Sequence, residues 1–590
     1  MTKLLKYLKK KEWLYALCAL VFIVAQVWLD LKMPDYMNTI TQIAQGGTNS
    51  VTGAAYELSD IWANGGYMLL CAVGSMVCSI ITSVFVVRIA ADFSARIRET
   101  LYTKVQGFSM SEINKFSTAS LITRSTNDVQ QVQMLITMGL QMVIKAPITA
   151  VWAITKIAGK QWQWSMAVAV AVLVMVCGIC VIMLLVIRKF KLLQTLTDKL
   201  NQVTRENLSG IRVVRAYNAE GFQQDKFESV NEEFTNTNLF TGRTMAFLSP
   251  LMSAVMNGIS LAIYWIGAFI INRASLMEFS GLFGDMVVFM SYGMQIISSF
   301  MMLAMMFMIA PRSLVSARRI NEVLETEELI EDGQGVGETK EKGTVEFKHV
   351  YFRYPDGNEN VLSDISFKAK TGDTVAFIGS TGCGKSSVVN LVSRFYDVNG
   401  GEVLVDGVNV RKYRKNELAK KIGYVSQKAV MFSGDIRSNI NFGDNDADDE
   451  TVEKAIEIAQ SNSFVSEQKG GIEGRVAQNG TNFSGGQKQR LSIARAIARD
   501  AEIYIFDDTF SALDYKTDRE LRKALKTEMK DATCLIVAQR IGTIMDADLI
   551  LVLENGRVVG QGTHKELLEN CAAYQEIARS QLSEEELKHE

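Results

Sequence analysis

Six long apolar stretches occupy the first 310 residues of this 590-residue chain. They span residues 13–29, about 67–89, about 140–157, 166–187, about 246–271 and 282–309. A helix needs about 17–25 mainly apolar residues to cross the hydrocarbon core of a bilayer, and each stretch meets that length. The sequence therefore predicts a membrane bundle of six transmembrane helices in the first half of the chain.

Basic residues outside these stretches set the expected orientation. Five lysines precede the first stretch: Lys3, Lys6, Lys9, Lys10 and Lys11. The first external segment, 33–64, contains no Lys or Arg, whereas the segments 88–133 and 188–243 are rich in both. By the positive-inside rule, the N-terminus, these two segments and the second half of the chain are expected to be cytoplasmic. The first stretch lacks a small-residue cleavage site and is interpreted as an anchor.

The two basic segments keep helical periodicity and contain few Gly or Pro residues. We expect the membrane helices to continue into the cytosol as two hairpins, since twenty helical residues reach about 30 Å. Each hairpin would then contact a separate cytoplasmic domain at its tip. A solvated coil is the alternative.

Two features of the apolar half allow two interpretations each. Lys145 lies inside the third stretch, where an ionisable residue is a functional signal, but snorkelling at the inner interface is favoured. The sixth stretch is rich in methionine: Met286, Met290, Met294, Met301, Met302, Met305, Met306 and Met308. Methionine suits adaptable binding surfaces, although a lipid-facing helix explains the composition equally well.

The second half has the composition of a soluble α/β domain, and a chain of this length is expected to hold more than one domain. We expect a membrane domain at 1–322, a polar linker at 323–343 and a nucleotide-binding domain at 344–590. The formal net charge is −2, which gives no indication of nucleic-acid binding. The eight cysteines show neither disulfide-framework nor zinc spacing. The predicted fold is thus an α-helical membrane bundle fused to an α/β P-loop domain.

A phosphate-binding loop follows the apolar strand 374–378. It comprises Gly379, Ser380, Thr381, Gly382, Cys383, Gly384, Lys385, Ser386 and Ser387. Glycines at this spacing let backbone N–H groups wrap phosphates, and the helix that follows adds its positive N-terminus. Lys385 is expected to reach the β- and γ-phosphates and Ser386 to bind Mg²⁺, together with Asp507 at the end of a second apolar strand. Cys383 is interpreted as a small packing residue, with a redox role as the alternative.

A second anion-binding pattern consists of Ser484, Gly485, Gly486 and Gln487 ahead of a helix rich in Arg and Ala. A serine hydroxyl and backbone amides at a helix start are suited to a γ-phosphate. One domain has no use for two such cradles around one nucleotide. The pattern is explained if two domains pack head to tail and the loop of each domain contacts the ATP bound by the other.

Together these motifs resemble the ATP-binding cassette (ABC) exporter family along nearly the whole chain. The resemblance implies ATP and Mg²⁺ as cofactors, and a role in adenine stacking for Tyr354, with an edge-strand tyrosine as the alternative. It implies that Gln427 contacts Mg²⁺ and the membrane domain, and that Asp514 in Ser511-Ala512-Leu513-Asp514 crosses to the opposite site. Two further sets are similar to the family's cytoplasmic hairpins: Leu121–Val129 with Arg124 and Asp128, and Glu206, Gly210–Ala216 and Glu220.

The chain departs from the family pattern at the residues of hydrolysis. Asp508 stands where the family has the general-base glutamate, and Gln539 replaces the switch histidine. Asp508 is one methylene shorter, and a misplacement of ~1 Å can cost about 10²-fold in rate. Gln539 can hydrogen-bond but cannot carry charge. Thr509-Phe510, Phe483 and Ser426 also differ from the usual residues.

These departures resemble the degenerate-site subunit of heterodimeric multidrug-type exporters in bacteria. The resemblance implies an unlike partner chain whose competent ATP site is completed by Ser484–Gln487 and Asp514 of this chain. The leading hypothesis is ATP-driven export of amphipathic or hydrophobic small molecules across the plasma membrane. A lipid or peptide exporter, and a slow homodimeric or regulatory ATPase, are the alternatives.

Overall fold

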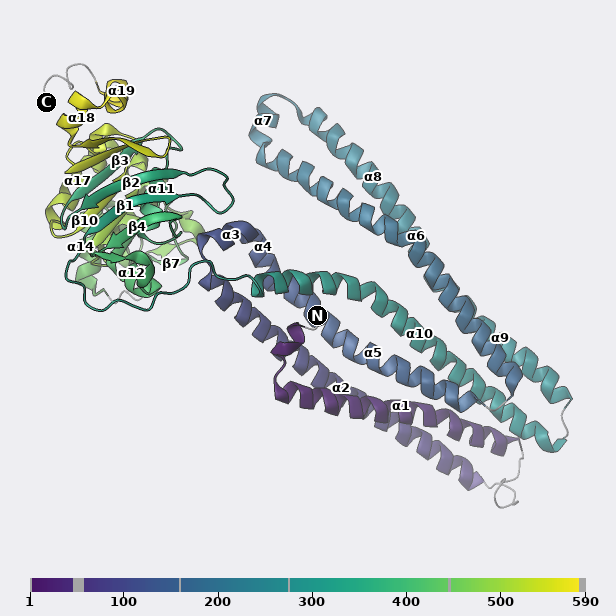
Figure 1. Cartoon of the computed structure of the whole chain (residues 1–590). Helices are drawn as coiled ribbons and strands as arrows, with labels where there is room; N and C mark the ends of the chain where they lie inside the picture. Colours follow the sequence, from purple (N-terminus) through teal and green to yellow (C-terminus); the bar gives the residue numbers. More distant parts are fainter. Residues whose placement is uncertain (1–2, 46–57, 159–160, 274–275, 444–446, 583–590) are drawn as a thin grey trace. The chain divides into compact units, whose positions relative to one another are not determined.

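The computed structural model describes residues 3–45, 58–158, 161–273, 276–443 and 447–582, and the chain forms two compact units (Figure 1). The first unit comprises residues 1–104 and 119–325. The second comprises residues 105–118 and 326–590. The tip of the first hairpin thus belongs to the same unit as the C-terminal half of the chain.

In the described residues of the first unit, all regular elements are helices. Its elements are η1 (Leu4–Tyr7), α1 (Lys10–Ala44), α2 (Leu58–Gly107), α4 (Thr118–Thr123), η2 (Arg124–Asp128), α5 (Val129–Ile157), α6 (Trp162–Ser209), α7 (Ile211–Ala216), α8 (Glu220–Ala246), α9 (Leu248–Asn272) and α10 (Leu276–Leu324). Six helices of the described chain are long and apolar enough to cross a membrane. The prediction of six spans with long extensions is confirmed, since α2 has 50 residues and α6 has 48.

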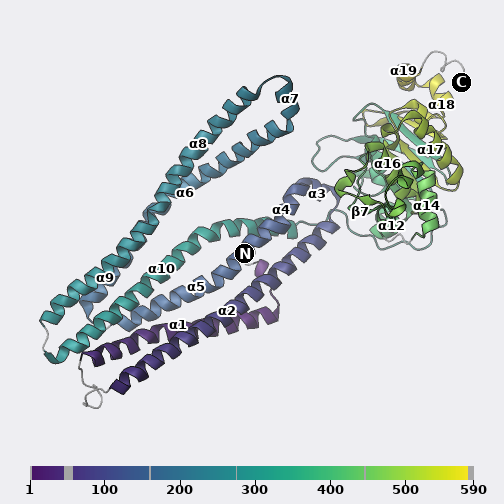
Figure 2. The ribbon, with the colours of Figure 1, turned by 180° about the vertical axis from the view of Figure 1, so that it is seen from behind.

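Helix α10 packs along both α5 and α1, and α6 pairs with α8 and α9 (Figures 1 and 2). Trp164 of α6 is fully buried, and its indole N–H donates to the Ile263 carbonyl of α9 at 3.2 Å. Its ring lies 5.1 Å from that of Phe289 on α10. A buried indole needs such a polar partner, so this contact fixes how the three helices meet.

Lys145 of α5 forms an ion pair inside the bundle. Its Nζ lies 3.5 Å from Oδ2 of Asp30 on α1, and the Ser75 hydroxyl of α2 donates to the other oxygen of Asp30 at 2.5 Å. The structure thus balances this charge with a carboxylate from another helix, an ion pair that the sequence did not reveal. Ionisable groups in membrane helices are typically paired in this way.

The methionine-rich helix α10 serves partly as a packing surface. Met286 is buried, and Met290, Met294 and Met301 are partly buried against the apolar core of the first unit. Met305, by contrast, is 43% exposed.

The two hairpins predicted to be cytoplasmic are held by contacts within the first unit. In the first, Arg124 lies 2.9 Å from Glu322 of α10, and the Asp128 carboxylate accepts from Ser316 at 2.7 Å. In the second, Lys226 of α8 lies 2.8 Å from Glu206 of α6. Long helices that continue beyond the membrane are thus tied to a neighbour.

Two main sheets form the second unit. An antiparallel sheet in the order β2-β1-β4-β5 comprises β1 (Val345–Phe352), β2 (Leu362–Ala369), β4 (Gly400–Val405) and β5 (Val408–Asn409). A six-stranded sheet in the order β12-β11-β3-β10-β9-β6 comprises β3 (Thr374–Gly379), β6 (Ile422–Val425), β9 (Ile503–Asp507), β10 (Thr533–Val537), β11 (Leu549–Glu554) and β12 (Arg557–Gly562). A two-stranded pair joins β7 (Gly434–Asp435) to β8 (Arg475–Val476).

Helices of the second unit connect or cover these strands. They are α3 (Met110–Phe116), α11 (Lys385–Val392), α12 (Lys415–Lys421), α13 (Ile436–Ile440), α14 (Asp449–Ile458), α15 (Asn462–Ser466), α16 (Gly485–Ile497), α17 (Tyr515–Glu528), α18 (His564–Asn570) and α19 (Ala572–Gln581). Short 3₁₀ turns are η3 (Val410–Lys412), η4 (Gly471–Glu473), η5 (Gln478–Gly480), η6 (Thr509–Ala512) and η7 (Ile541–Thr543).

The core of the large sheet is parallel: β11, β3, β10, β9 and β6 run in the same direction. All five residues of β9 are buried, as expected for a parallel strand covered on both faces. In this order the carboxyl ends of β3, β9 and β10 meet at one edge of the sheet, which is where ligands bind in open α/β sheets.

Candidate functional site

The phosphate loop connects the carboxyl end of β3 to α11. Lys385, the first residue of α11, donates from Nζ to the carbonyl oxygens of Gly379 and Ser380, at 2.8 Å each. Gly384 has a φ of +102°, and a Cβ there would lie 2.7 Å from a methyl carbon of Leu362. Only glycine fits this position, because the left-handed backbone and the close neighbour both oppose a side chain.

Gly382 and Cys383 have different surroundings within the loop. A Cβ at Gly382 would meet nothing within 4 Å. Cys383 is buried, with its Sγ 3.7 Å from Nζ of Lys385. This burial agrees with the packing role predicted for Cys383.

A hydroxyl and a carboxylate converge at the end of β9. Ser386 donates from Oγ to Oδ1 of Asp507 at 2.7 Å. Burial raises the pKa of the Asp507 carboxyl, and it also raises the pKa of the nearby Tyr424 hydroxyl. Hard oxygen ligands of this kind fit Mg²⁺, and a divalent cation beside Asp507 would offset the cost of burying its charge.

One oxygen of the Asp508 carboxylate accepts hydrogen bonds from two side-chain amides. Oδ2 lies 2.9 Å from Nε2 of Gln539 and 3.2 Å from Nε2 of Gln427. Asp508 is 9% exposed and has a φ of +47°, in the left-handed region. The structure therefore brings the two departures from the family pattern into direct contact, and Gln427 with them.

Tyr354, two residues after β1, stands in an aromatic cluster. Its ring lies edge-on to those of Phe352 and Tyr396, at 4.8 and 5.1 Å. Its hydroxyl shares a hydrogen bond with the Ser387 hydroxyl at 2.8 Å. The residue predicted to stack on adenine is thus attached to the first turn of α11, beside the phosphate loop.

Tyr396 is a site residue that the sequence analysis missed. The Asn114 amide of α3 donates to the Tyr396 hydroxyl at 3.4 Å. A contact therefore runs from the tip of the first hairpin through Tyr396 to Tyr354. No motif marks Tyr396, because it lies 42 residues from Tyr354 and only the fold brings the rings together.

Ser484 and Gln487 cap helix α16. The Ser484 hydroxyl accepts from the Gln487 N–H at 3.3 Å, and the Gln487 side chain accepts from the Ser484 N–H at 2.9 Å. Phe483 is buried and packs edge-on against Phe464, at 6.2 Å between ring centroids, so this departure from the usual leucine fills the domain core.

The glycines of this motif lie against the next loop. A Cβ at Gly486 would lie 3.3 Å from the carbonyl oxygen of Ala512, and one at Gly485 would meet nothing within 4 Å. Asp514 caps α17 by accepting from the Thr517 N–H at 3.0 Å, and hydrogen bonds from Thr517 lower the pKa of its carboxyl. Helix α16 also reaches the Gln427 loop, since the Gln489 amide donates to the Ser426 carbonyl at 3.2 Å.

The predicted residues thus form two groups. The first lies around the carboxyl edge of the large sheet: Tyr354, Gly379–Ser387, Gln427, Asp507, Asp508 and Gln539. The second is Ser484–Gln487 with Asp514, each at the start of its own helix. Within the described ranges, no hydrogen bond or ion pair joins the second group to the phosphate loop.

Both halves of the chain match models of known protein families. Residues 16–326 match the family model of the ABC transporter transmembrane region, and residues 362–511 match that of the ABC transporter. An uncharacterized ABC transporter ATP-binding protein of Mycobacterium bovis is 37% identical, covering 88% of this chain and 87% of that protein. YfiB of Bacillus subtilis, described in the same words, is 33% identical over 99% of both chains.

Two further comparisons concern a curated relative and a solved structure. An ATP-dependent lipid A-core flippase of Pseudomonas aeruginosa is 31% identical, covering 86% of this chain and 83% of that protein. A bacterial Atm1-family ABC exporter with ATP bound shares the fold at a TM-score of 0.76, with 22% identity over 96% of this chain and 99% of that one.

Proposed function

Because the chain belongs to the ABC transporter family, as a membrane domain fused to an ATPase domain, we propose that it exports amphipathic or hydrophobic small molecules by alternating access. The proposed location is the bacterial plasma membrane, with the N-terminus and the nucleotide-binding domain in the cytosol. The charge distribution supports this orientation, since basic residues flank the spans on that side.

The proposed site binds ATP with Mg²⁺. Lys385 would exchange its two carbonyl partners for phosphate oxygens, and Ser386 and Asp507 would hold the metal. The cation neutralises charge on the β- and γ-phosphates when bound. The Tyr354 ring would stack on adenine, and the backbone N–H groups of Gly379–Ser387 would donate hydrogen bonds to the phosphates.

The contact of Gln539 and Gln427 with Asp508 carries the proposal that this site hydrolyses slowly. A general base must reach the attacking water, but the same oxygen of Asp508 is engaged by two amides at 2.9 and 3.2 Å. Its side chain is also one methylene shorter than glutamate. Both features move the carboxylate away from an in-line water.

A second, unlike half-transporter would supply the competent site. Ser484–Gln487 and Asp514 keep the residues that would act on the partner's ATP. The tip of the second hairpin also presents apolar side chains that suit a protein partner: Val213 is 61% exposed, Phe222 70% and Tyr217 80%. Exposed apolar groups clustered in this way mark interaction sites.

The test is the subunit composition and ATPase activity of the complex extracted gently from its native membrane. We expect a one-to-one complex with a half-transporter that carries Glu after its magnesium aspartate and a switch His. Substrate should stimulate hydrolysis only in the two-chain complex. A pure homodimer whose slow hydrolysis does not respond to substrate would instead support the regulatory alternative.

Lipid export is the second candidate, favoured by the 31% identity to the lipid A-core flippase. Transport assays on the reconstituted two-chain complex distinguish the two functions. Translocation of a headgroup-labelled lipid, without uptake of small amphipathic dyes into inverted vesicles, would support lipid as the substrate.

A further inference from the structure

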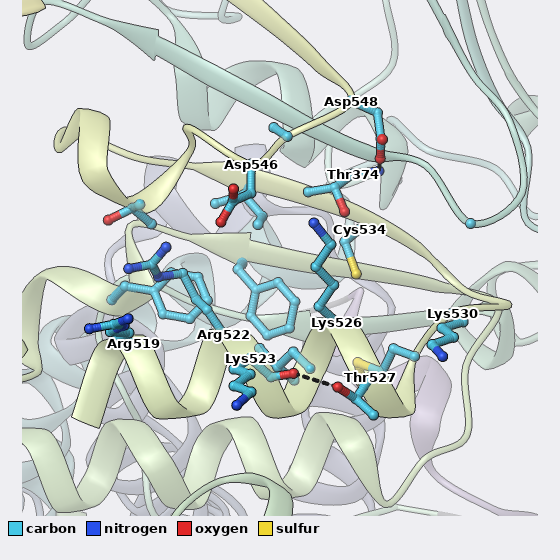
Figure 3. Close-up of a pocket in the computed structure, with 18 residues that line it drawn as sticks. Thr374, Arg519, Arg522, Lys523, Lys526, Thr527, Lys530, Cys534, Asp546 and Asp548 are labelled. Carbon is cyan, nitrogen blue, oxygen red and sulfur yellow. Dashed lines mark hydrogen bonds between the residues drawn. The ribbon is translucent and has the colours of Figure 1, made fainter. Parts of the chain in front are cut away.

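A cavity of about 560 Å³ lies in the second unit, between α17 and the large sheet (Figure 3). Thr374 at the start of β3, Cys534 near the start of β10 and Asp548 just before β11 line it, and α17 forms the opposite wall. Its lining includes none of Gly379–Ser387, Gln427 or Gln539, although Phe506 and Phe510 flank Asp507 and Asp508 in the chain.

The cavity combines an apolar floor with a basic rim. Phe510, Met529 and Ile536 contribute to the floor. Lys523, Lys526 and Lys530 stand on or just after α17, and Figure 3 shows Lys526 extending from the helix toward the strands. An apolar surface with a few directed polar groups is typical of a binding site.

These three lysines have no ion-pair partner within the described part of the chain, and all are exposed. By contrast, Arg522 on the same wall forms hydrogen bonds to Asp518 at 3.1 and 3.2 Å. Asp548, on the opposite side, accepts from the Thr374 N–H at 2.8 Å. Arg519 and Asp546 also line the cavity, so its lining carries five basic and two acidic side chains, and this excess of positive charge suits an acidic occupant.

The sequence carries an acidic segment after Leu582, the last described residue. Eight residues follow Leu582, namely Ser583-Glu584-Glu585-Glu586-Leu587-Lys588-His589-Glu590. Three consecutive glutamates followed by one leucine match a basic rim around an apolar floor. An extended chain of eight residues spans at most about 26–29 Å.

The point of departure of this segment is fixed beside the cavity wall. The Gln581 side chain donates to the Gln539 carbonyl at 2.7 Å and accepts from the Ile541 N–H at 2.8 Å. Thr543, two residues after Ile541, lines the cavity. Leu582 packs against the same apolar cluster that includes Phe510, Met529 and Ile536.

We propose that residues 583–590 dock into this cavity of their own domain, with Glu584–Glu586 on Lys523, Lys526 and Lys530 and with Leu587 on the apolar floor. Helix α17 begins directly after Asp514, so the docked segment would brace the helix that positions this loop. The inference does not depend on the proposed function, because it concerns contacts within one domain.

Zero-length carbodiimide cross-linking of the full-length protein in its membrane complex tests the contact. Mass spectrometry should find isopeptide bonds from Glu584–Glu586 to Lys523, Lys526 or Lys530. Mixing ¹⁴N- and ¹⁵N-labelled protein distinguishes bonds within one chain from bonds between copies. Bonds found only between copies, or to other lysines, would overturn the proposal.

Lysine acetylation gives an independent measurement. Removing residues 583–590, or the triple change Glu584→Lys, Glu585→Lys and Glu586→Lys, should speed acetylation of Lys526 by about two- to fivefold, as expected when exposed ion pairs are lost. Lys516, the second residue of α17, does not line the cavity and serves as the internal standard. Glu576→Lys, an exposed change on α19, is the matched control and should leave Lys526 unchanged. Equal Lys526 reactivity in all four proteins would show that the segment does not occupy the cavity.

Discussion

The amide of Gln539 donates to Oδ2 of Asp508 at 2.9 Å, so the two residues that depart from the ATP-hydrolysing pattern form one hydrogen-bonded pair. Neither departure is an isolated substitution. A carboxylate one methylene shorter than glutamate, with a neutral amide on one of its oxygens, is the arrangement behind the proposal that this site hydrolyses ATP slowly.

Changes at Asp508 and at Ser484 should have unequal effects on the two-chain complex. Asp508→Asn is expected to change steady-state ATP hydrolysis by less than about twofold, because the proposed model assigns most turnover to the other site. Ser484→Ala should reduce it by about 10²–10³-fold, the range typical of losing one donor to a developing oxyanion. Malachite-green phosphate assays on reconstituted complex measure both.

Loss of the helix cap alone is the confounding effect of Ser484→Ala. Thr563→Ala removes an equivalent cap, at α18, away from the nucleotide. Each cap change should cost about 1 kcal/mol of stability, so thermal unfolding of the two variants should match. A similar loss of activity in Asp508→Asn and Ser484→Ala would contradict the model of two unequal sites.

Restoring hydrolysis at this chain's own site should require both members of the pair. Asp508→Glu returns the missing methylene, but the carboxylate would still face the Gln539 amide; Gln539→His alone leaves the acid too short. The double change is expected to raise ATPase activity beyond the product of the two single effects, with a coupling of about 0.5–3 kcal/mol. Single-turnover hydrolysis, with the partner's general base removed, isolates this site. Strictly multiplicative effects would show that the pair does not act as a unit.

Tyr396 should support nucleotide binding through its ring and hairpin coupling through its hydroxyl. Its edge-on contact with Tyr354 is of a kind worth about 0.5–1.5 kcal/mol, so Tyr396→Ala should weaken ATP affinity by roughly two- to tenfold. Tyr396→Phe keeps the ring and should bind ATP normally. Titration with a fluorescent ATP analogue provides the affinities.

The same pair of variants tests the link to Asn114. Tyr396→Phe removes the acceptor for the Asn114 amide, so substrate stimulation of ATPase activity should fall while ATP affinity is retained. Asn114→Ala should reproduce this loss. Normal stimulation in both variants would indicate that the hairpin communicates through other contacts.

Glu112 should hold the first hairpin tip to the linker in a pH-dependent way. Its buried carboxylate accepts from the Leu329 N–H at 2.8 Å and from the Ser109 N–H at 2.7 Å. Burial raises its pKa, but the hydrogen bonds from the Ser109 hydroxyl and the Leu329 amide outweigh burial, and the pKa is lowered overall.

A lowered folded-state pKa means that the contact stabilises the fold fully above the unfolded value of about 4.3, and that this contribution is lost as pH falls through the folded value. Hydrogen exchange at Leu329, corrected for the intrinsic rate, should therefore be constant from pH 6 to 8. Glu112→Gln should accelerate it at pH 7, since bonds to a charged acceptor are worth about 1.5–3 kcal/mol. Unchanged protection in the variant would refute the role of the charge.

Much of this fold could be predicted from local sequence. Apolar length defined the six spans, and the strand-loop-helix pattern around Gly379–Ser387 located the phosphate loop, because these signals are complete within a few tens of residues. Lys145 shows the limit: its partner Asp30 lies 115 residues earlier, so no local pattern could reveal the ion pair.

The sequence by itself determined which chemical groups the chain has: the intact phosphate loop, the intact Ser484–Gln487 motif, and aspartate and glutamine at positions 508 and 539. Only the tertiary structure decided that Gln427 and Gln539 share one oxygen of Asp508, and that Tyr396 joins Asn114 to Tyr354. The physical reason is that hydrogen bonds and ring contacts depend on distances of a few ångströms between residues far apart in the chain, and the packing of strands and hairpins sets those distances.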